Sequence, residues 1–197
     1  MMKHYFTDNT DLESSPVQFV FRYRQYDILF TSDTGVFSKS MIDYGSRVLL
    51  ECFEKDEEQS LLDVGCGYGT FGICLKKVYP DLKTDMVDIN DRALNLAKLN
   101  AQNNHVDVRI FKSSVYDEVE DMYDIIVSNP PVRVGKSVVM SILEGAYDHL
   151  HDHGSLWIVL QKKQGAPSAK KKMTEVFGNC EIVKRDKGYY ILKSKKI

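Results

Sequence analysis

Two short polar motifs, each directly after an apolar run, have the residue types and spacing of an enzyme site. In the first, Asp63 ends an apolar run and is followed by a Gly-x-Gly-x-Gly turn that closes at Gly69. The second is Asn129-Pro130-Pro131, which follows the apolar residues 125–127. Because ligands of open α/β sheets bind in the crevice at the carboxyl ends of the strands, we predict that the two motifs share one site.

The glycine motif predicts a loop that approaches a small ligand closely. Gly65 and Gly67 permit a tight turn and close backbone approach, and Gly69 lets a helix begin against the strand. Dinucleotide enzymes use a similar pattern to bind a pyrophosphate. Here Asp63 precedes the glycines, and its charge favours a cationic ligand with an amino group instead. A plain strand–helix turn is the alternative interpretation.

A second acid, Asp88, ends the next apolar run about 20 residues beyond the glycines, where a carboxylate can accept hydrogen bonds from two ribose hydroxyls. The alternative role is an acid near the N-terminus of the helix expected after Asn90. An adenosine that carries a cationic amino acid would satisfy both Asp63 and Asp88. S-adenosylmethionine is such a ligand.

The Asn129-Pro130-Pro131 motif predicts rigid hydrogen-bond acceptors for an amine. The side-chain oxygen of Asn129 and the carbonyl oxygen of Pro130 can both accept, and the prolines fix the backbone before substrate binds. Two acceptors on one planar NH2 group can aim its nitrogen lone pair at an electrophilic methyl group and stabilise the positive charge that grows on nitrogen. A proline-rich turn without chemistry is the alternative.

The apolar pattern predicts an α/β fold that positions these motifs. Residues 17–31 alternate as a β-hairpin, and a helix capped by Ser38 or Ser40 follows. Strands alternating with helices then imply a mostly parallel sheet with helices on both faces. We expect strands at 60–64, 83–88, 106–111, 123–128 and 155–160, helices at 69–78, 91–103, 136–151 and 168–177, and a closing antiparallel hairpin around residues 186–188.

Length and composition bound the class of protein. A chain of 197 residues with 43% hydrophobic residues suits one globular domain. We expect a flexible N-terminus at 1–16 and a single domain at 17–197, in which the hairpin and helix (17–55) precede the core (60–197). No run is long enough to cross a bilayer, and the N-terminus lacks a signal-peptide core. Four scattered cysteines predict reduced thiols in a cytoplasmic protein, without a metal site.

The charge of the chain is divided unequally. Residues 161–197 contain 11 Lys or Arg against 3 Asp or Glu, so they carry +8 while the whole chain carries −2. A basic surface of this kind favours a polyanionic partner. A solvated, lysine-rich face is the alternative.

Taken in order, residues 63–69, Asp88 and Asn129-Pro130-Pro131 resemble the motifs of class I S-adenosylmethionine-dependent methyltransferases that act on amino groups. Segments 30–38 and 43–50 resemble those of the small-subunit (16S) ribosomal RNA guanine-N2 methyltransferase family, and segment 161–168 resembles its downstream strand end. The resemblance extends over nearly the whole chain from residue 17. It implies a Rossmann-like sheet of seven strands whose last strand is antiparallel, and S-adenosylmethionine as the cofactor, with S-adenosylhomocysteine as product and no metal.

The resemblance also implies roles for individual residues. Asn129, with Pro130 and Pro131, orients the target amine. The cofactor would be bound by Asp63, Gly65, Cys66, Gly67, Tyr68, Gly69, Asp88, Ile89, Ser114, Val115 and Asn129. The substrate would be bound by Phe37, Val132, Arg133, Lys136, Lys162 and Lys163. Among these, the basic residues are expected to contact phosphates at the rim of the crevice, or else to be ordinary surface residues.

The chain departs from the family pattern at two places. Val132 stands where many relatives have an aromatic residue that stacks on the target base, so stacking would come from elsewhere, with Phe37 as one candidate. Ser114 stands near the expected adenine site, where many relatives have an acid, and would accept a hydrogen bond more weakly.

We therefore expect a cytoplasmic, monomeric or homodimeric enzyme that methylates an exocyclic amine, N2 of a guanine in ribosomal RNA, on a base that is unpaired or flipped out. A protein glutamine N5-methyltransferase is one alternative. A non-catalytic module that binds RNA or S-adenosylmethionine is the other.

Overall fold

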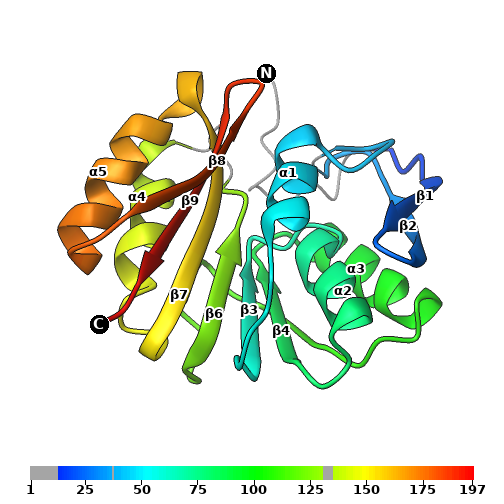
Figure 1. Cartoon of the computed structure of the whole chain (residues 1–197). Helices are drawn as coiled ribbons and strands as arrows, with labels where there is room; N and C mark the ends of the chain where they lie inside the picture. Colours follow the sequence, from blue (N-terminus) through cyan, green and yellow to red (C-terminus); the bar gives the residue numbers. More distant parts are fainter. Residues whose placement is uncertain (1–12, 37, 131–134) are drawn as a thin grey trace.

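The computed structural model describes residues 13–36, 38–130 and 135–197, and Figure 1 shows the arrangement of the elements. An N-terminal hairpin precedes a central sheet that is flanked by helices on both faces. The strands are β1 (Val17–Tyr23), β2 (Tyr26–Ser32), β3 (Ser60–Val64), β4 (Lys83–Asp88), β5 (Arg109–Lys112), β6 (Tyr123–Ser128), β7 (Leu150–Gln161), β8 (Glu181–Asp186) and β9 (Tyr189–Lys195). The helices are α1 (Tyr44–Cys52), α2 (Thr70–Val78), α3 (Asp91–Asn103), α4 (Lys136–Gly145), the short 3-10 helix η2 (Lys162–Gln164) and α5 (Ala166–Phe177).

The central sheet has seven strands in the order β5-β4-β3-β6-β7-β9-β8. The first five strands in this order pair in parallel, whereas β9 runs antiparallel to both β7 and β8. This arrangement confirms the predicted fold class, including the antiparallel last strand and the N-terminal hairpin. It also brings the carboxyl ends of β3, β4, β6 and β7 to one edge of the sheet.

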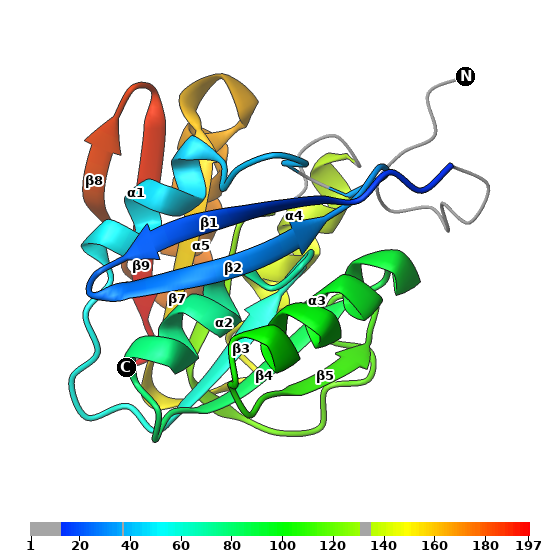
Figure 2. The same ribbon diagram turned by 90° about the vertical axis from the view of Figure 1, so that its right-hand side faces the viewer.

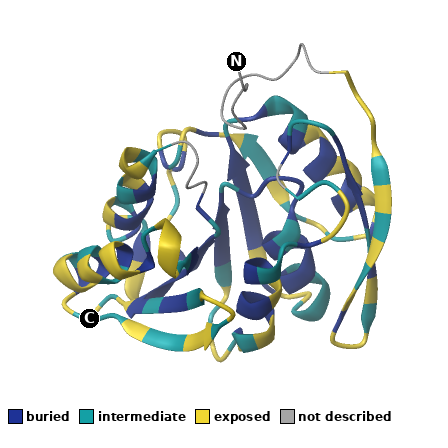
Figure 3. Cartoon of the chain, turned by 90° about the horizontal axis from the view of Figure 1, so that it is seen from above, coloured by how far each residue is buried: buried dark blue, intermediate teal, exposed yellow. Residues whose placement is uncertain are grey.

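Alternating residues of the sheet strands supply two separate hydrophobic cores. Leu61 packs with the residues beneath α1, α2 and α3, whereas its neighbour Leu62 packs with those beneath α4 and α5. In β7, Trp157 and Ile158 divide in the same way. The burial colouring in Figure 3 shows the central strands buried between the two helical layers. A strand that is buried on both faces reads as a continuous apolar run, and this explains why these strands were predictable.

The hairpin β1–β2 is attached to α3 by two asparagine side chains. Asn104 accepts a hydrogen bond from the Leu29 N–H (3.0 Å) and donates to the Leu29 carbonyl (2.7 Å). One helical turn earlier, Asn100 accepts from the Thr31 N–H (2.7 Å) and donates to the Thr31 carbonyl (2.9 Å). The two carboxamides thus satisfy alternate residues of β2 much as a neighbouring strand would. Figure 2 shows the hairpin lying along α3.

Two predicted helix boundaries were wrong. The N-cap of α1 is Asp43, whose Oδ1 accepts from the Ser46 N–H at 3.1 Å, and not Ser38 or Ser40. The helix predicted at 136–151 ends at Gly145, and the ring of Tyr116 packs against this glycine, where a Cβ would lie 2.7 Å from it. From Leu150 the chain already pairs with Tyr123 in the sheet. The third core strand covers 109–112 and not 106–111.

Among the residues that the structure describes, no helix is both long and apolar enough to cross a membrane. Residues 1–12 of the predicted flexible N-terminus lie outside the described residues. Ser14 and Ser15, which come just after these residues, are held by Asp33. Its carboxylate accepts from the Ser14 hydroxyl (2.7 Å) and from the Ser15 N–H (2.6 Å).

Candidate active site

The two polar motifs meet where the strand order of the sheet reverses. The chain passes from β3 outward to β4 and β5, and then returns to place β6 on the other side of β3. Asp63 and Val127 are partners in the parallel register, and the Ser128 hydroxyl donates to the Val64 carbonyl at 2.7 Å. Such a reversal opens a crevice at the carboxyl ends of the two strands. The structure thus brings together the loops that the sequence predicted to share one site.

The glycine loop is held by hydrogen bonds from its own backbone to β4. The N–H groups of Gly65 and Cys66 both donate to the Val87 carbonyl at 2.9 Å. Gly69 has φ = 100°, and a Cβ there would lie 2.6 Å from Ile73 Cδ1 and 2.9 Å from Met86 Cε. Glycine at this position therefore serves both the left-handed turn and the close approach of α2 to the sheet. Within the loop, Cys66 and Tyr68 are buried.

Asp63 is completely buried beneath the loop, and within the described part of the chain one of its carboxylate oxygens has a hydrogen-bond partner. Its Oδ2 accepts from the Gly72 N–H at 2.9 Å, at the start of α2. Its Oδ1 has no hydrogen-bond partner among the described residues. Burial raises the pKa of Asp63 to about 7, and the nearby charge of Asp88 adds to the rise, although the hydrogen bond from Gly72 opposes it. An acid in this condition is suited to a positively charged hydrogen-bond donor.

Asp88 joins the glycine loop to the start of α3. Its Oδ2 accepts from the Gly67 N–H and its Oδ1 from the Asn90 N–H, both at 2.9 Å. Asn90 in turn caps α3 by accepting from the Ala93 N–H at 3.1 Å. These bonds fix the Asp88 carboxylate between the glycine loop and the start of α3, at the carboxyl end of β4.

The carboxamide of Asn129 has one polar end fixed by protein. Its Nδ2 donates to both oxygens of Asp43, at 3.2 and 3.3 Å, and to the Ser46 hydroxyl at 3.0 Å. Its Oδ1 accepts no hydrogen bond from the described residues, and the side chain is half-buried. The next residue, Pro130, is buried. Asn129 thus presents an unsatisfied acceptor beside the glycine loop.

The remaining predicted residues lie around this edge or outside the described part. Ile89 and Val115 are half-buried and Ser114 is exposed, in a segment joined to β4 by the bond from the Ser113 N–H to the Asp88 carbonyl (3.1 Å). Lys136 begins α4, while Lys162 and Lys163 begin η2 directly after β7, and all three are exposed. The predicted residues Phe37, Pro131, Val132 and Arg133 lie outside the described residues.

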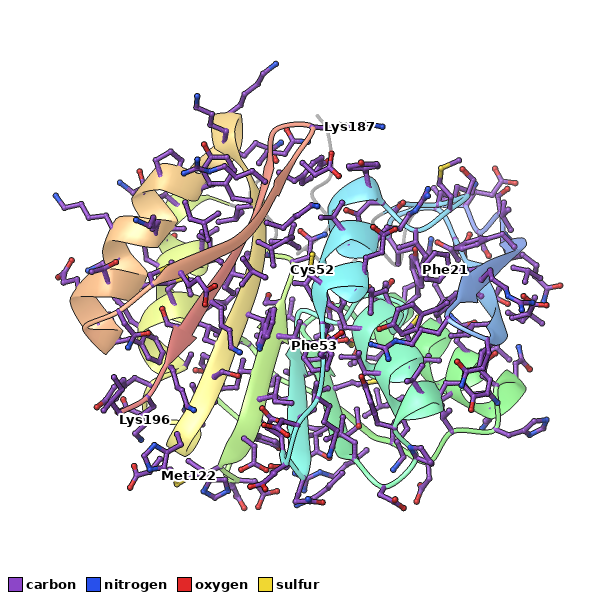
Figure 4. The ribbon with its side chains drawn as sticks, in the orientation of Figure 1. Phe21, Cys52, Phe53, Met122, Lys187 and Lys196 are labelled. Carbon is purple, nitrogen blue, oxygen red and sulfur yellow. The ribbon has the colours of Figure 1, made fainter. Side chains whose placement is uncertain are left out.

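Sequence reasoning missed several residues that the fold brings to this edge. Asp43 and Ser46 contact Asn129, although 86 and 83 positions separate them from it. Asn100 donates to the Tyr68 carbonyl at 2.9 Å and so supports the glycine loop from α3. Lys187, in the β8–β9 turn, lies 4.7 Å from the ring centre of Tyr44, the residue after Asp43. Figure 4 shows Lys187 at the upper rim, and Met122 and Lys196 at the opposite edge.

Comparison with known proteins identifies the family to which this chain belongs. The sequence profile of the family described as "Methyltransferase small domain" matches residues 27–193. The chain belongs to the methyltransferase small domain family. One relative, the uncharacterized protein YbxB of Bacillus subtilis (strain 168), is 44% identical over the full length of both chains. The family membership confirms the predicted resemblance to S-adenosylmethionine-dependent methyltransferases.

Two relatives that act on ribosomal RNA are longer than this chain. The ribosomal RNA small subunit methyltransferase C of Vibrio parahaemolyticus is 32% identical over 82% of this chain and 48% of its own length. The solved T. thermophilus 16S rRNA N2 methyltransferase RsmC, in complex with AdoMet and guanosine, superposes with a TM-score of 0.84 at 24% identity over 94% of this chain and 52% of its own. The chain thus spans about half the length of these relatives, and the superposition shows a shared fold.

Proposed function

We propose that this protein transfers a methyl group from S-adenosylmethionine to the exocyclic N2 amine of a guanine in small-subunit ribosomal RNA. The observation that carries this proposal is the unsatisfied oxygen of Asn129, fixed at the strand-order reversal beside the buried acid Asp63. An acid for a cationic donor molecule then lies at the end of β3, and an acceptor for an amine directly follows the neighbouring strand β6. The RsmC relatives, which share the family, support the choice of ribosomal RNA.

The residues at this edge fit S-adenosylmethionine. The buried oxygen of Asp63 that lacks a partner would accept from the amino group of the methionine part, and the glycine loop allows close approach of that part. Asp88, at the end of β4 and bonded to the Gly67 N–H, would accept from the ribose hydroxyls, as an acid at this position does in Rossmann-like sites. Ile89, Ser114 and Val115 would surround the adenine. When bound, the cofactor supplies an electrophilic methyl group on a cationic sulfur.

Asn129 would hold the target amine through its carboxamide oxygen. Since its Nδ2 is occupied by Asp43 and Ser46, only the oxygen is available to a substrate N–H. A fixed acceptor beside the amine restricts its rotation and stabilises the positive charge that develops on nitrogen during transfer. Pro130 and Pro131 would supply the rigid backbone and a second, carbonyl acceptor.

The RNA would contact the half of the same edge that lies over β7 and β9. Lys162, Lys163 and Lys187 are exposed there, and the Lys162 N–H donates to the Gly188 carbonyl at 2.8 Å, which joins η2 to the β8–β9 turn. Lysines near the crevice would position the RNA backbone without reading its sequence. Lys136 and Arg133 are proposed to extend this surface. We further propose that residues 17–197 form one methyltransferase domain, which acts in the cytoplasm as a monomer or homodimer.

The test is methyl transfer from labelled S-adenosylmethionine to small-subunit ribosomal RNA and to assembled subunits, followed by mass spectrometry of the nucleosides. We expect N2-methylguanosine, and we expect Asn129→Ala to lower turnover about 100-fold or more while cofactor affinity stays within about twofold. Label in a protein glutamine would favour the glutamine methyltransferase alternative. Absence of both cofactor binding and transfer would favour a non-catalytic module.

A further inference from the structure

Asp43 connects the start of α1 with the turn that carries Asn129. Its Oδ1 accepts from the Ser46 N–H at 3.1 Å and caps the helix. Both of its oxygens also lie within 3.3 Å of Asn129 Nδ2. Helix capping does not require this second set of contacts, because the capping bond is complete without them.

The chemistry of Asp43 determines which way the Asn129 carboxamide points. An ionised carboxylate can only accept hydrogen bonds, so the group that faces it must be the NH2 end of the carboxamide. The Ser46 hydroxyl is a third acceptor for the same nitrogen. The oxygen of Asn129 is therefore turned to the opposite side, which the protein leaves unsatisfied among its described residues.

We propose that Asp43, assisted by Ser46, is a positioning residue that holds Asn129 with its carboxamide oxygen toward the substrate amine. This inference rests on the proposed function for the identity of that amine. Without Asp43 the carboxamide can rotate by half a turn and present two N–H donors, which repel an amine that must itself donate. The N-terminal helix thus controls the orientation of a catalytic group 86 positions later in the chain.

The substitution Asp43→Asn separates this role from helix capping. Asparagine caps helices as well as aspartate does, so its side-chain oxygen can still accept from the Ser46 N–H. Its NH2 group then takes the place of Oδ2, which lies 3.3 Å from Asn129 Nδ2, so one acceptor of that nitrogen becomes a donor that opposes it. We expect this opposition to turn the Asn129 carboxamide so that its oxygen faces position 43. We expect kcat to fall about 100-fold, the usual cost of misplacing a catalytic group, while cofactor affinity and the thermal midpoint stay nearly constant.

Three further variants test the same contact. Asn129→Asp alone places two carboxylates against each other and should be as impaired as Asp43→Asn. The exchange Asp43→Asn with Asn129→Asp restores a donor facing an acceptor and leaves an oxygen toward the substrate, so it should regain about tenfold in kcat over either single change. Ser46→Ala removes one of the three acceptors and should lower kcat about threefold. Asp27→Asn is the matched control, because the Asp27 carboxylate pairs with the exposed Arg22 on the hairpin and, among the described residues, with no group of the site.

The side-chain NH2 resonance of Asn129 gives a readout that does not depend on activity. We expect it to be protected from hydrogen exchange in the wild type and to shift in Asp43→Asn, with the backbone amides of α1 unmoved. Wild-type turnover in Asp43→Asn, an exchange variant no better than either single variant, or an unprotected Asn129 amide in the wild type would each overturn the proposal. A protected amide in a protein that methylates no RNA would instead refute the proposed function.

Discussion

The buried carboxyl of Asp63 should make cofactor affinity depend on pH in the neutral range. Its pKa is raised to about 7 by burial, whereas an aspartate in an unfolded chain titrates near 4. A cation binds the ionised form, and the ionised fraction rises from about one-tenth at pH 6 to about nine-tenths at pH 8. Affinity for S-adenosylmethionine should therefore increase about tenfold across this interval.

Asp63→Asn supplies the control for this prediction. Its side-chain oxygen can still accept from the Gly72 N–H, so the loop and the start of α2 keep their connection. The amino group of the ligand titrates in the same interval, but it does so equally for both proteins. The ratio of wild-type to variant affinity, measured by titration calorimetry from pH 6 to pH 8, isolates the contribution of Asp63. A ratio that stays constant across the interval would refute the assignment of Asp63 to the cofactor cation.

The same pKa shift predicts the sign of a stability change without cofactor. A folded-state pKa above the unfolded value means that the folded protein holds its proton more tightly. The contribution of Asp63 to the free energy of unfolding is therefore complete below about pH 4 and is lost as the pH rises through about 7. Asparagine does not titrate, so Asp63→Asn has no such loss. In urea denaturation, the free energy of unfolding of the variant should therefore rise relative to that of the wild type as the pH increases from 5 to 8.

Three other substitutions test the supports around the site. Asn100→Ala should lower the free energy of unfolding in urea by about 3 kcal/mol, because the backbone groups of Thr31 and Tyr68 lose buried partners; a loss below about 0.5 kcal/mol would contradict this. Gly72→Ala should lower the free energy of unfolding by about 1–3 kcal/mol, because the added Cβ would collide with Met86 Sδ. An unchanged midpoint in thermal denaturation would contradict this and show that Met86 moves aside without cost. Changing both Lys162 and Lys163 to Gln should reduce the slope of log RNA affinity against log salt by about 2, whereas Lys83→Gln at the opposite edge should not; equal slopes would remove these lysines from the RNA surface.

The parts of the site that the sequence predicts are those with local signals. Asp63 lies near the end of β3 and Asn129 directly follows β6, and both strands are buried on both faces and appear as short apolar runs. The glycines mark the first turn, and the antiparallel end of the sheet follows from the turn signal at Gly188. These signals need only a few adjacent residues, and the reversal of strand order then brings the two loops together.

The parts that the sequence does not predict depend on partners distant in the chain. Asn100 and Asn104 look like the polar face of an amphipathic helix, yet both are buried because they satisfy the backbone of β2. Asp43 caps α1 by accepting from the Ser46 N–H. Aspartate and serine are about equally favoured as N-caps, so the residue types do not distinguish Asp43 from Ser38 and Ser40. The apolar Leu150 extended the predicted fourth helix, although it pairs with Tyr123 in the sheet. For the two asparagines and for Leu150, a contact with a remote backbone overrides the local pattern.

The carboxyl edge of the sheet has an acidic half and a basic half. This division would place the cofactor and the RNA of the proposed reaction on opposite sides of Asn129. Asp63, Asp88 and Asp43 lie over β3, β4 and the start of α1, where a cationic donor is stabilised and a polyanion is repelled. Lys162 and Lys187 lie over the end of β7 and the β8–β9 turn, where the preferences are reversed. Asn129 stands at the end of β6, between the two halves, and is neutral. An RNA drawn to the lysines would therefore be kept off the cofactor loop by the acids, and only a base that leaves the helix and reaches inward would come to the carboxamide of Asn129.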